Sequence, residues 1–354
     1  MSEGRIAPAW PRSLDPRFGP PAPGQYRAQA DDFIVEEVLG FVPEGDGEHL
    51  WLHIEKRNQT TLDVVRTLAK ACEVRSRDIG YAGMKDRIAV TRQWLSIHLP
   101  GKAAPDALGE ILAARGIKVL VQARHPRKLK RGVHRANRFR LRVTGEAIAT
   151  EAFALRWDAL CRQGVPNYFG PQRFGPGGRN LARARQVLAR GWRKKDDREG
   201  MLLSSARSFL FNEVLGKRVQ AATWGVPLVG DVMMLEGTAS IFTADEVDES
   251  LLLRARELDV HPTGVLWGTG GATVSADEAW LRDTHPALCQ GLEAAGVKRA
   301  RRALRMRLDE PQLTRTDEAV SLHFSLPRGG FATAVLAELI EHPDFATMAM
   351  GGSF

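Results

Sequence analysis

Hydrophobic and polar positions alternate along several stretches in the first part of the chain. In residues 50–55 and 90–99 apolar side chains recur at every second position, and residues 32–41 are rich in strand-forming side chains. Residues 60–72 change to helical spacing, and they begin with a Thr-x-x-Asp pattern typical of a capping box. These patterns predict a half-buried sheet with a helix packed on it.

A glycine-rich turn and a strand with two different faces are predicted in the same way. Residues 80–86 (GYAGMKD) place two glycines between predicted strands, which indicates a turn. Residues 138–143 alternate arginine with Phe139, Leu141 and Val143, so one face of this strand is apolar and the other is basic. The core takes the apolar face, and a polyanion fits the basic one.

The residues before and after the predicted sheet show other patterns. Residues 1–23 contain six of the nineteen prolines and little apolar periodicity, which predicts a mobile or surface-draped leader. Beyond residue 181 the chain changes to arginine-rich helical patterns and short strands, with a turn-rich segment at 262–271. A strand at 322–326 and a helix at 331–340 follow. The length of 354 residues favours two domains.

The net charge of +8 comes from one segment. Residues 124–142 contain nine Lys or Arg and no acid, whereas the rest of the chain carries 41 bases and 42 acids. Such a cluster favours an anionic partner: a phosphate backbone first, an acidic membrane surface second. A solvated face that binds nothing is the alternative. The other basic runs, 183–190 and 298–307, are too rich in alanine and too poor in aromatic residues for a membrane-binding helix.

The sequence lacks the motifs of several common classes of enzyme and of membrane proteins. Cys72, Cys161 and Cys289 lie far apart, without the spacing of a zinc site or a disulfide framework. No apolar run approaches the roughly 18 residues that span a bilayer, so we expect a cytoplasmic protein. Phosphate-binding, zinc-hydrolase, serine-hydrolase and dinucleotide motifs are all missing from the sequence. The sequence therefore gives no basis for nucleotide hydrolysis, zinc hydrolysis or dinucleotide redox chemistry.

Asp86 is the candidate for chemistry in the glycine turn. It stands between Lys85 and Arg87 where the turn enters the strand at residue 90. A turn or capping aspartate is the ordinary interpretation. The functional alternative is a nucleophilic carboxylate that neighbouring cations keep ionised.

Aromatic and amide side chains supply further candidates. The loop 164–178 (GVPNYFGPQRFGPGG) combines five glycines and three prolines with three aromatic rings, which favours a binding element. Within it, Phe169 either fills the core or stacks on a nucleic-acid base. Asn167 either caps the turn or hydrogen-bonds to a base edge. Phe33 alternates with Val35 on its strand and is equally well explained as a core residue.

Six motifs in order along the chain strongly resemble the TruD family of tRNA pseudouridine synthases. The resemblance runs from about Gln25 to the C-terminus and leaves out only the proline-rich leader. The motifs are DDFIVEE (31–37), GMKDRIAVTRQ (83–93), RHPRKLKRG (124–132), GVPNYFGPQRFG (164–175), SSARSFLFN (204–212) and LPRGGFATAVLAEL (326–339).

The resemblance implies a reaction and assigns residues to it. A tRNA uridine, typically at position thirteen in the D-arm, is isomerised to pseudouridine without a metal or organic cofactor. The family's catalytic aspartate corresponds to Asp86, and its active-site phenylalanine and asparagine correspond to Phe169 and Asn167. Phe33 and Lys85 match further active-site positions, which we assign to substrate binding.

One position departs from the family pattern. Where the family commonly has a lysine ahead of the DF motif, this sequence has Arg27, which keeps the charge but is a poor proton shuttle. We expect Arg27 to bind a carboxylate or phosphate. The basic side chains that we expect to contact the RNA backbone are Arg127, Lys128, Lys130, Arg131, Arg138, Arg140 and Arg173.

The resemblance also implies an α/β fold of the α+β type. It predicts a pseudouridine-synthase-like catalytic domain with a mixed, largely antiparallel sheet, at residues 24–185 and 306–354, interrupted by an inserted TruD-specific α/β domain at 186–305. The leader is 1–23. The domains are expected to face each other across a basic cleft, with the basic run near Arg302 on its far wall.

The implied partner is tRNA, bound by a monomer with no membrane association. A protein from another class, a non-catalytic basic RNA-binding or RNA-folding protein, stays the alternative. It differs in one expectation: Asp86 is dispensable, whereas Arg127 to Arg131 are essential.

Overall fold

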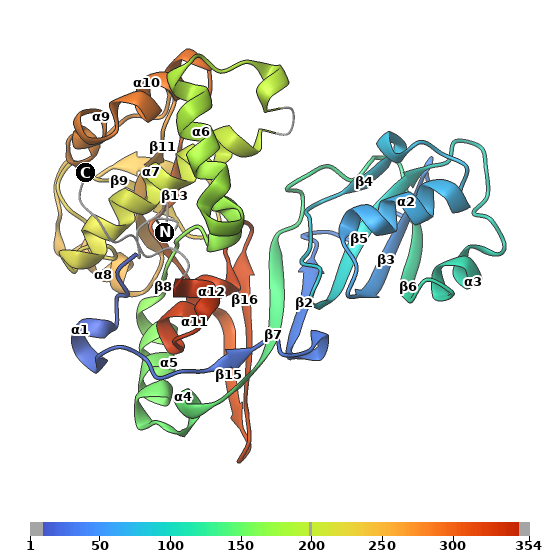
Figure 1. Cartoon of the computed structure of the whole chain (residues 1–354), viewed down its shortest axis with the longest axis horizontal. Coiled ribbons are helices and arrows are strands. Elements are labelled where there is room, and N and C mark those ends of the chain that lie inside the picture. The colour runs from blue at the N-terminus through green and yellow to red at the C-terminus, as the bar shows by residue number, and fades with distance from the viewer. Residues whose placement is uncertain (1–9, 198–199, 347–354) are drawn as a thin grey trace, which may run out of the picture. The chain divides into compact units, whose positions relative to one another are not determined.

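The computed structural model describes residues 10–197 and 200–346, which form two compact units (Figure 1). One unit, here called the sheet unit, comprises residues 25–148 and 309–329. The other, here called the helical unit, comprises residues 10–24, 149–308 and 330–346 within the described ranges. These packing units do not test the predicted functional division into a catalytic domain and an inserted domain, which stays a prediction.

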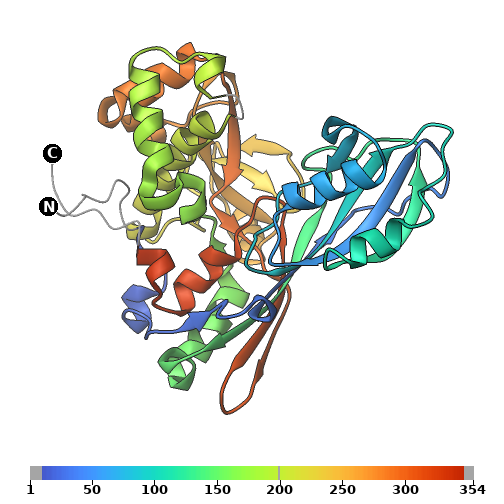
Figure 2. The same cartoon turned by 45° about the vertical axis from the view of Figure 1, so that its right-hand side comes forward.

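The sheet unit is built on one mixed, mainly antiparallel sheet. Its strand order is β15-β16-β7-β2-β5-β3-β6, with β1 beside β7 and β4 beside β5, and only the β2–β5 pair is parallel. The strands are β1 (Gln25–Tyr26), β2 (Phe33–Val38), β3 (His49–Arg57), β4 (Ile79–Tyr81), β5 (Val90–His98), β6 (Ile117–His125), β7 (Ala136–Thr144), β15 (Asp309–Arg315) and β16 (Val320–Pro327). Figure 2 shows β15 and β16 as a hairpin.

Helices α2 (Thr61–Ala71) and α3 (Leu108–Ala113) cover one face of this sheet (Figure 1). The capping box at the start of α2 is confirmed, since the Thr60 hydroxyl accepts from the Asp63 amide and the Asp63 carboxylate accepts from the Thr60 amide. The remaining short helices of this part are η1 (Ala30–Asp32), η2 (Ser76–Asp78) and α4 (Glu146–Ala149).

The two-faced strand is also confirmed. Strand β7 buries Phe139, Leu141 and Val143, while Arg138 and Arg140 are exposed. Period-two alternation determines which face of a strand meets the core, so this feature follows from the sequence alone.

The helical unit combines helices with a smaller sheet, ordered β10-β9-β11-β13-β12, and the pair β8–β14. Its strands are β8 (Val165–Pro166), β9 (Val232–Leu235), β10 (Ile241–Thr243), β11 (Val260–Leu266), β12 (Thr269–Gly271), β13 (Lys298–Ala303) and β14 (Arg305–Met306). Its helices are α1 (Asp15–Phe18), α5 (Glu151–Gln163), η3 (Pro171–Phe174), η4 (Pro176–Gly178), α6 (Arg179–Ala189), η5 (Lys194–Asp196), α7 (Met201–Gln220), α8 (Glu249–Arg256), η6 (Ala276–Glu278), α9 (Trp280–Thr284), α10 (Pro286–Ala294), α11 (Ala332–Leu339) and α12 (Pro343–Ala346).

Two glycine positions correct the predicted turns. Gly80 lies inside strand β4, where a side chain would collide with the carbonyl of Leu129. The predicted turn-rich segment 262–271 begins instead with β11, an inner strand of its sheet, and an added Cβ at Gly264 would lie 2.9 Å from atoms of Leu304 and Phe211. Both glycines allow a close approach between packed elements, which local sequence patterns do not distinguish from a turn.

Of the two alternatives for the leader, mobile or surface-draped, residues 10–23 agree with the second, because they pack on the helical unit. Leu14 is buried, and the amides of Ser13 and Leu14 donate to the Glu338 carboxylate on α11. Arg156, buried on α5, pairs with Asp15 at 3.0 Å. Residues 1–9 of the predicted leader lie outside the described residues.

Candidate functional site

The turn that carries Asp86 lies in the sheet unit between β4 and β5, and its carboxylate is exposed. The backbone carbonyl of Asp86 accepts from Lys56 Nζ at 3.2 Å. Side-chain oxygens that are not engaged in an ion pair are available to a ligand. The position therefore suits a carboxylate that acts on a bound substrate.

Lys85, the neighbour of Asp86, turns away from solvent. Its Nζ lies 3.0 Å from Glu37 Oε2, with the two side chains 6% and 0% exposed, and it donates to Asn137 Oδ1 at 2.6 Å. Burial raises the pKa of Glu37, and the nearby Lys85 ammonium opposes that rise. Burial, followed by repulsion from Lys85, lowers the pKa of His134 to about 4, so this ring is neutral near pH 7. Lys85 is thus held in a buried polar cluster beneath the turn.

Lys56 is a second buried lysine beneath the same turn, and sequence reasoning missed it. Its side chain is completely buried, and burial lowers its pKa to about 8. The Asp86 carboxylate partly opposes this effect. The signal in the sequence was a lysine at the inward position that follows Leu50, Leu52 and Ile54.

Phe33 and Arg27 lie together at the start of β2. Phe33 is only 2% exposed and packs against Tyr26 and Phe139, so the core interpretation of this residue describes its place in the structure. The Arg27 guanidinium lies 5.5 Å from the Phe33 ring centre and 5.0 Å from that of Tyr26. Arg27 has a positive φ of 60°, an uncommon conformation for a residue with a side chain.

The predicted RNA-backbone residues of the segment 127–131 have different surroundings. Arg127 and Lys130 are exposed. Lys128 Nζ donates to the Arg77 carbonyl, and Arg131 donates to the Tyr81 hydroxyl at 2.9 Å while stacking on its ring. The cluster is therefore a basic surface whose side chains are partly fixed by neighbouring turns.

Carboxylates accompany the arginine face of β7. Arg138 Nη1 lies 4.0 Å from Glu36, and Arg142 Nη1 lies 3.6 Å from Asp32. Arg140, which is exposed between them, has no carboxylate within ion-pair distance among the described residues. Of the two exposed arginines on this face, Arg140 carries the less neutralised charge.

A second group of predicted residues lies in the helical unit. Phe169 is 7% exposed, with its ring against Phe211 and Phe331. The Arg302 guanidinium carbon lies 4.1 Å from the centre of the Phe169 ring, and that of Arg173 lies 5.5 Å from it. Burial, followed by repulsion from Arg173, lowers the pKa of Arg302 to about 9. The aromatic candidate is thus part of a ring cluster that carries two cations.

Asn167 and Asn212 fix the backbone of this loop. The Asn167 side chain accepts from Arg302 and donates to the Ala303 carbonyl at 2.9 Å. Asn212 on α7 accepts from the Phe169 amide at 2.9 Å and donates to the Phe169 carbonyl at 3.0 Å. The motif SSARSFLFN therefore contributes a buried amide that clamps Phe169.

Two of the six basic residues in the run 298–307 are buried inside the helical unit, and the place of this run on the wall of a cleft stays a prediction. Arg301 is buried in an ion pair of 2.5 Å with Glu278. Arg305 is also buried, and it donates to His261 and to the carbonyls of Ala255 and Val260. Both guanidinium groups are bound by partners within the helical unit, so they are not available to bind phosphates.

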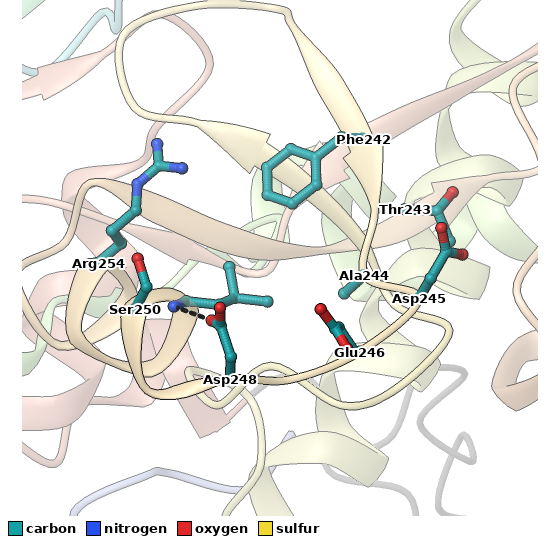
Figure 3. Close-up of a pocket in the computed structure, with 9 residues that line it drawn as sticks. Phe242, Thr243, Ala244, Asp245, Glu246, Asp248, Ser250 and Arg254 are labelled. Carbon is teal, nitrogen blue, oxygen red and sulfur yellow. Dashed lines mark hydrogen bonds between the residues drawn. The ribbon is translucent and has the colours of Figure 1, made fainter.

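The helical unit also has an open cavity of about 490 Å³ beside α8 (Figure 3). Asp245, Glu246 and Asp248 line it together with Arg254. Asp248 caps α8 by accepting from the Leu251 amide at 2.7 Å. Three carboxylates make this cavity unsuitable for a polyanion, and none of the predicted site residues lies in it.

Two further features concern cofactors and membranes. In the described ranges, His, Cys, Asp and Glu side chains do not gather into groups of three or more that could hold a metal ion. None of the helices within those ranges is both long enough and apolar enough to cross a bilayer.

The family model described as tRNA pseudouridine synthase D (TruD) matches residues 19–194 and 195–339. The chain belongs to the TruD family. A relative named tRNA pseudouridine synthase D from Chromohalobacter salexigens is 57% identical over 97% of this chain and 99% of its own length. One of the same name from Methylococcus capsulatus is 43% identical over 90% of this chain and 91% of its own.

A solved TruD-family structure supports the fold. The crystal structure of the putative tRNA pseudouridine synthase D from Methanosarcina mazei matches with a TM-score of 0.65 and 20% identity, covering 92% of this chain and 95% of that one. The predicted family and the α+β fold class are confirmed.

The structure divides the TruD candidate residues between the two units. Asp86, Lys85, Phe33 and Arg27 belong to the sheet unit with the basic residues of 127–140. Asn167, Phe169 and Arg173 belong to the helical unit. Within each unit, sequence reasoning missed the groups that hold the candidates in place, and these are Lys56, Glu37, Asn212 and Arg302.

Proposed function

We propose that this protein isomerises a uridine of tRNA to pseudouridine, at position thirteen in the D-arm, with Asp86 as the catalytic carboxylate. The observation that carries the proposal is membership of the TruD family over most of the chain, together with an exposed carboxylate in the GMKD turn. The basic surface at 127–131 and the arginine face of β7 supply a surface of the right charge for RNA.

The reaction moves one bond and leaves the composition of the nucleoside unchanged. The uridine leaves its stack at a cost of a few kcal/mol. The bond between uracil N1 and ribose C1′ breaks, the ring turns, a bond between C5 and C1′ forms, and the proton on C5 is transferred to N1 overall. Asp86 attacks, or removes a proton, at the ribose or the uracil ring.

The residues of the helical unit are proposed to bind the uracil. Phe169 stacks on the extruded base, and Asn167 recognises a polar edge. In the structure both are buried and engaged with Arg302, so this role requires Arg302 to exchange these contacts for contacts with the substrate. Because phenylalanine has no ionisable group, Phe169 does not take the C5 proton, which leaves Asp86 or a water molecule to accept it.

Tritium release from tRNA labelled at uridine C5 tests the proposal. Wild-type protein is expected to release tritium, and Asp86→Asn, which keeps the shape and removes the charge, is expected to release none while still binding tRNA. The matched control is Asp78→Asn, an aspartate near the preceding strand β4 that is not part of the site. An Asp86→Asn variant with the wild-type rate would show that Asp86 is not the catalytic residue.

The same experiment distinguishes an enzyme from a non-catalytic RNA-binding protein. A non-catalytic RNA-binding protein would bind tRNA tightly, release no tritium as wild type, and lose binding when Arg127 and Lys130 are changed. Mapping pseudouridine in tRNA from cells with and without the gene tests position thirteen. That the protein is cytoplasmic and monomeric stays a prediction. Light scattering, which measures the mass in solution, tests whether it is a monomer.

A further inference from the structure

Lys56 occupies a core position on strand β3. Leu50, Leu52 and Ile54 point from the same face of β3 into the apolar cluster beneath α2 and α3, and Lys56 takes the next inward position with no exposed surface. Burying an ammonium group is costly unless hydrogen bonds replace its hydration. A lysine at such a position therefore calls for a specific role.

The contacts of Lys56 connect two loops. Its Nζ donates to the Gln59 carbonyl at 2.5 Å, just before the capping residue of α2, and to the Asp86 carbonyl at 3.2 Å. One ammonium group thus joins the start of α2 to the turn that carries the proposed catalytic carboxylate. The side chain of Asp86 is itself exposed.

A neutral hydrogen bond fixes the adjacent residue in the same way. The Lys85 amide donates to the Thr61 hydroxyl at 3.0 Å, and that hydroxyl donates to the Gln93 side chain at 2.9 Å. The turn is thus attached from below at two successive residues, once through Thr61 and once through Lys56. Of these two main-chain attachments, the one through Lys56 carries a charge, and the Lys85 side chain adds its ion pair with Glu37.

The charged groups around Lys56 come from the turn and from α2. Asp86 and Asp63 attract its ammonium group, and Lys85 repels it. The residues opposite Lys56 on the neighbouring strands, Thr91 on β5 and Ile117 on β6, are uncharged. Burial is the largest influence and lowers the pKa of Lys56 to about 8.

We propose that Lys56 is a positioning residue for the reaction, whose buried ammonium group fixes the main chain at Asp86 and places a positive charge behind the Asp86 carboxylate. The inference rests on the proposed function. It adds to that function a residue that does not touch the substrate, and it gives the reaction rate a dependence on the charge of that residue.

Single-turnover tritium release and tRNA binding test the catalytic part. Lys56→Met keeps the length of the side chain and removes the charge, and it is expected to lower the rate by about 100-fold, the cost of a misplaced catalytic group. The tRNA dissociation constant is expected to stay within about twofold of the wild-type value, because Lys56 is buried and does not contact the tRNA. The matched control is Lys118→Met on β6, an exposed lysine, which is expected to keep the wild-type rate.

The pH profile distinguishes a charge from a packing role. The wild-type rate is expected to fall as the pH rises through about 8, where Lys56 loses its proton. Lys56→Arg stays protonated throughout, so the rate of this variant is expected not to change with pH across this range. A fall through pH 8 that persists unchanged in Lys56→Arg or Lys56→Met would assign the titration to another group and overturn the electrostatic part of the proposal.

Amide hydrogen exchange of the free protein provides a readout that does not need activity. In Lys56→Met the peptide covering residues 82–90 is expected to exchange at least tenfold faster, while the rest of the sheet unit and the Lys118→Met control are unchanged. Unchanged exchange, or faster exchange throughout the sheet unit, overturns the proposal. Wild-type protein that releases no tritium overturns the proposed function and the catalytic role together, whereas the exchange result still decides whether Lys56 holds the turn.

Discussion

The guanidinium carbon of Arg302 lies 4.1 Å from the centre of the Phe169 ring. The same side chain donates to both the carbonyl and the side chain of Asn167. Two residues that the TruD resemblance assigns to substrate binding are therefore coupled through a third residue from a distant part of the chain. A desolvated cation over an aromatic face contributes about 2 kcal/mol, so this coupling is large enough to measure.

A double-mutant cycle of Phe169→Leu and Arg302→Met measures that coupling. Each single change removes the cation–ring contact, so the double variant loses it only once. The coupling free energy of unfolding is expected to be about 2 kcal/mol, measured by denaturant unfolding. Strictly additive effects would show that the two side chains do not stabilise each other. Arg282→Met with Phe169→Leu serves as the control, since Arg282 stacks on Trp267 instead.

Glu37→Gln is expected to destabilise the protein through Lys85. The change leaves the Lys85 ammonium buried without its carboxylate, which costs about 3 kcal/mol in the free energy of unfolding. Replacing both partners, with Glu37→Leu and Lys85→Met, is expected to recover most of this loss because no charge is then buried. Urea unfolding of the wild type and the two variants checks this, and a loss below about 0.5 kcal/mol for Glu37→Gln would contradict it.

Arg140→Ala is expected to weaken tRNA binding and reduce its salt dependence. A contact to one phosphate contributes about one to the slope of log K against log salt concentration, so that slope is expected to fall by about one. Filter binding over a range of salt concentrations measures it. Arg66→Ala is the control, because Arg66 on α2 is exposed and pairs with Asp63 at 3.0 Å. Equal slopes for both variants would exclude Arg140 from the RNA interface.

Glu338 is expected to make the stability of the helical unit depend on pH. Burial raises its pKa to about 7, although hydrogen bonds from Ser13 and Leu14 oppose the rise. A carboxyl group with a raised pKa in the folded state contributes stability that is complete below its unfolded pKa, near 4.5, and is lost as the pH rises through about 7. The free energy of unfolding is therefore expected to fall by about 3 kcal/mol across this window.

Denaturant unfolding at pH 4.5 and pH 7.5 tests this dependence. Glu338→Gln does not titrate and is expected to lack the fall. Glu341→Gln, whose side chain is 49% exposed in wild type, is expected to show the same fall as wild type. A Glu338→Gln protein with the wild-type pH dependence would assign the effect to another group.

The sequence by itself determined the features that depend on local periodicity. The alternation in β7 specified its buried and exposed faces, and the Thr60–Asp63 pattern specified the start of α2. These succeed because backbone geometry alone decides which side chains share a face. The motifs around Asp86 and Phe169 were sufficient to identify the TruD family, since long collinear motifs carry information beyond local structure.

Only the tertiary structure decided the partners of the charged residues. Arg301 and Arg305 belong to a basic run in the sequence, yet each is buried against groups from other elements. Lys85 stands beside Asp86 in the chain but pairs with Glu37, and Lys56, thirty residues earlier, holds the Asp86 backbone instead. A charge is stabilised by whatever the fold packs around it, and the fold brings together residues whose separation along the chain carries no signal of their contact.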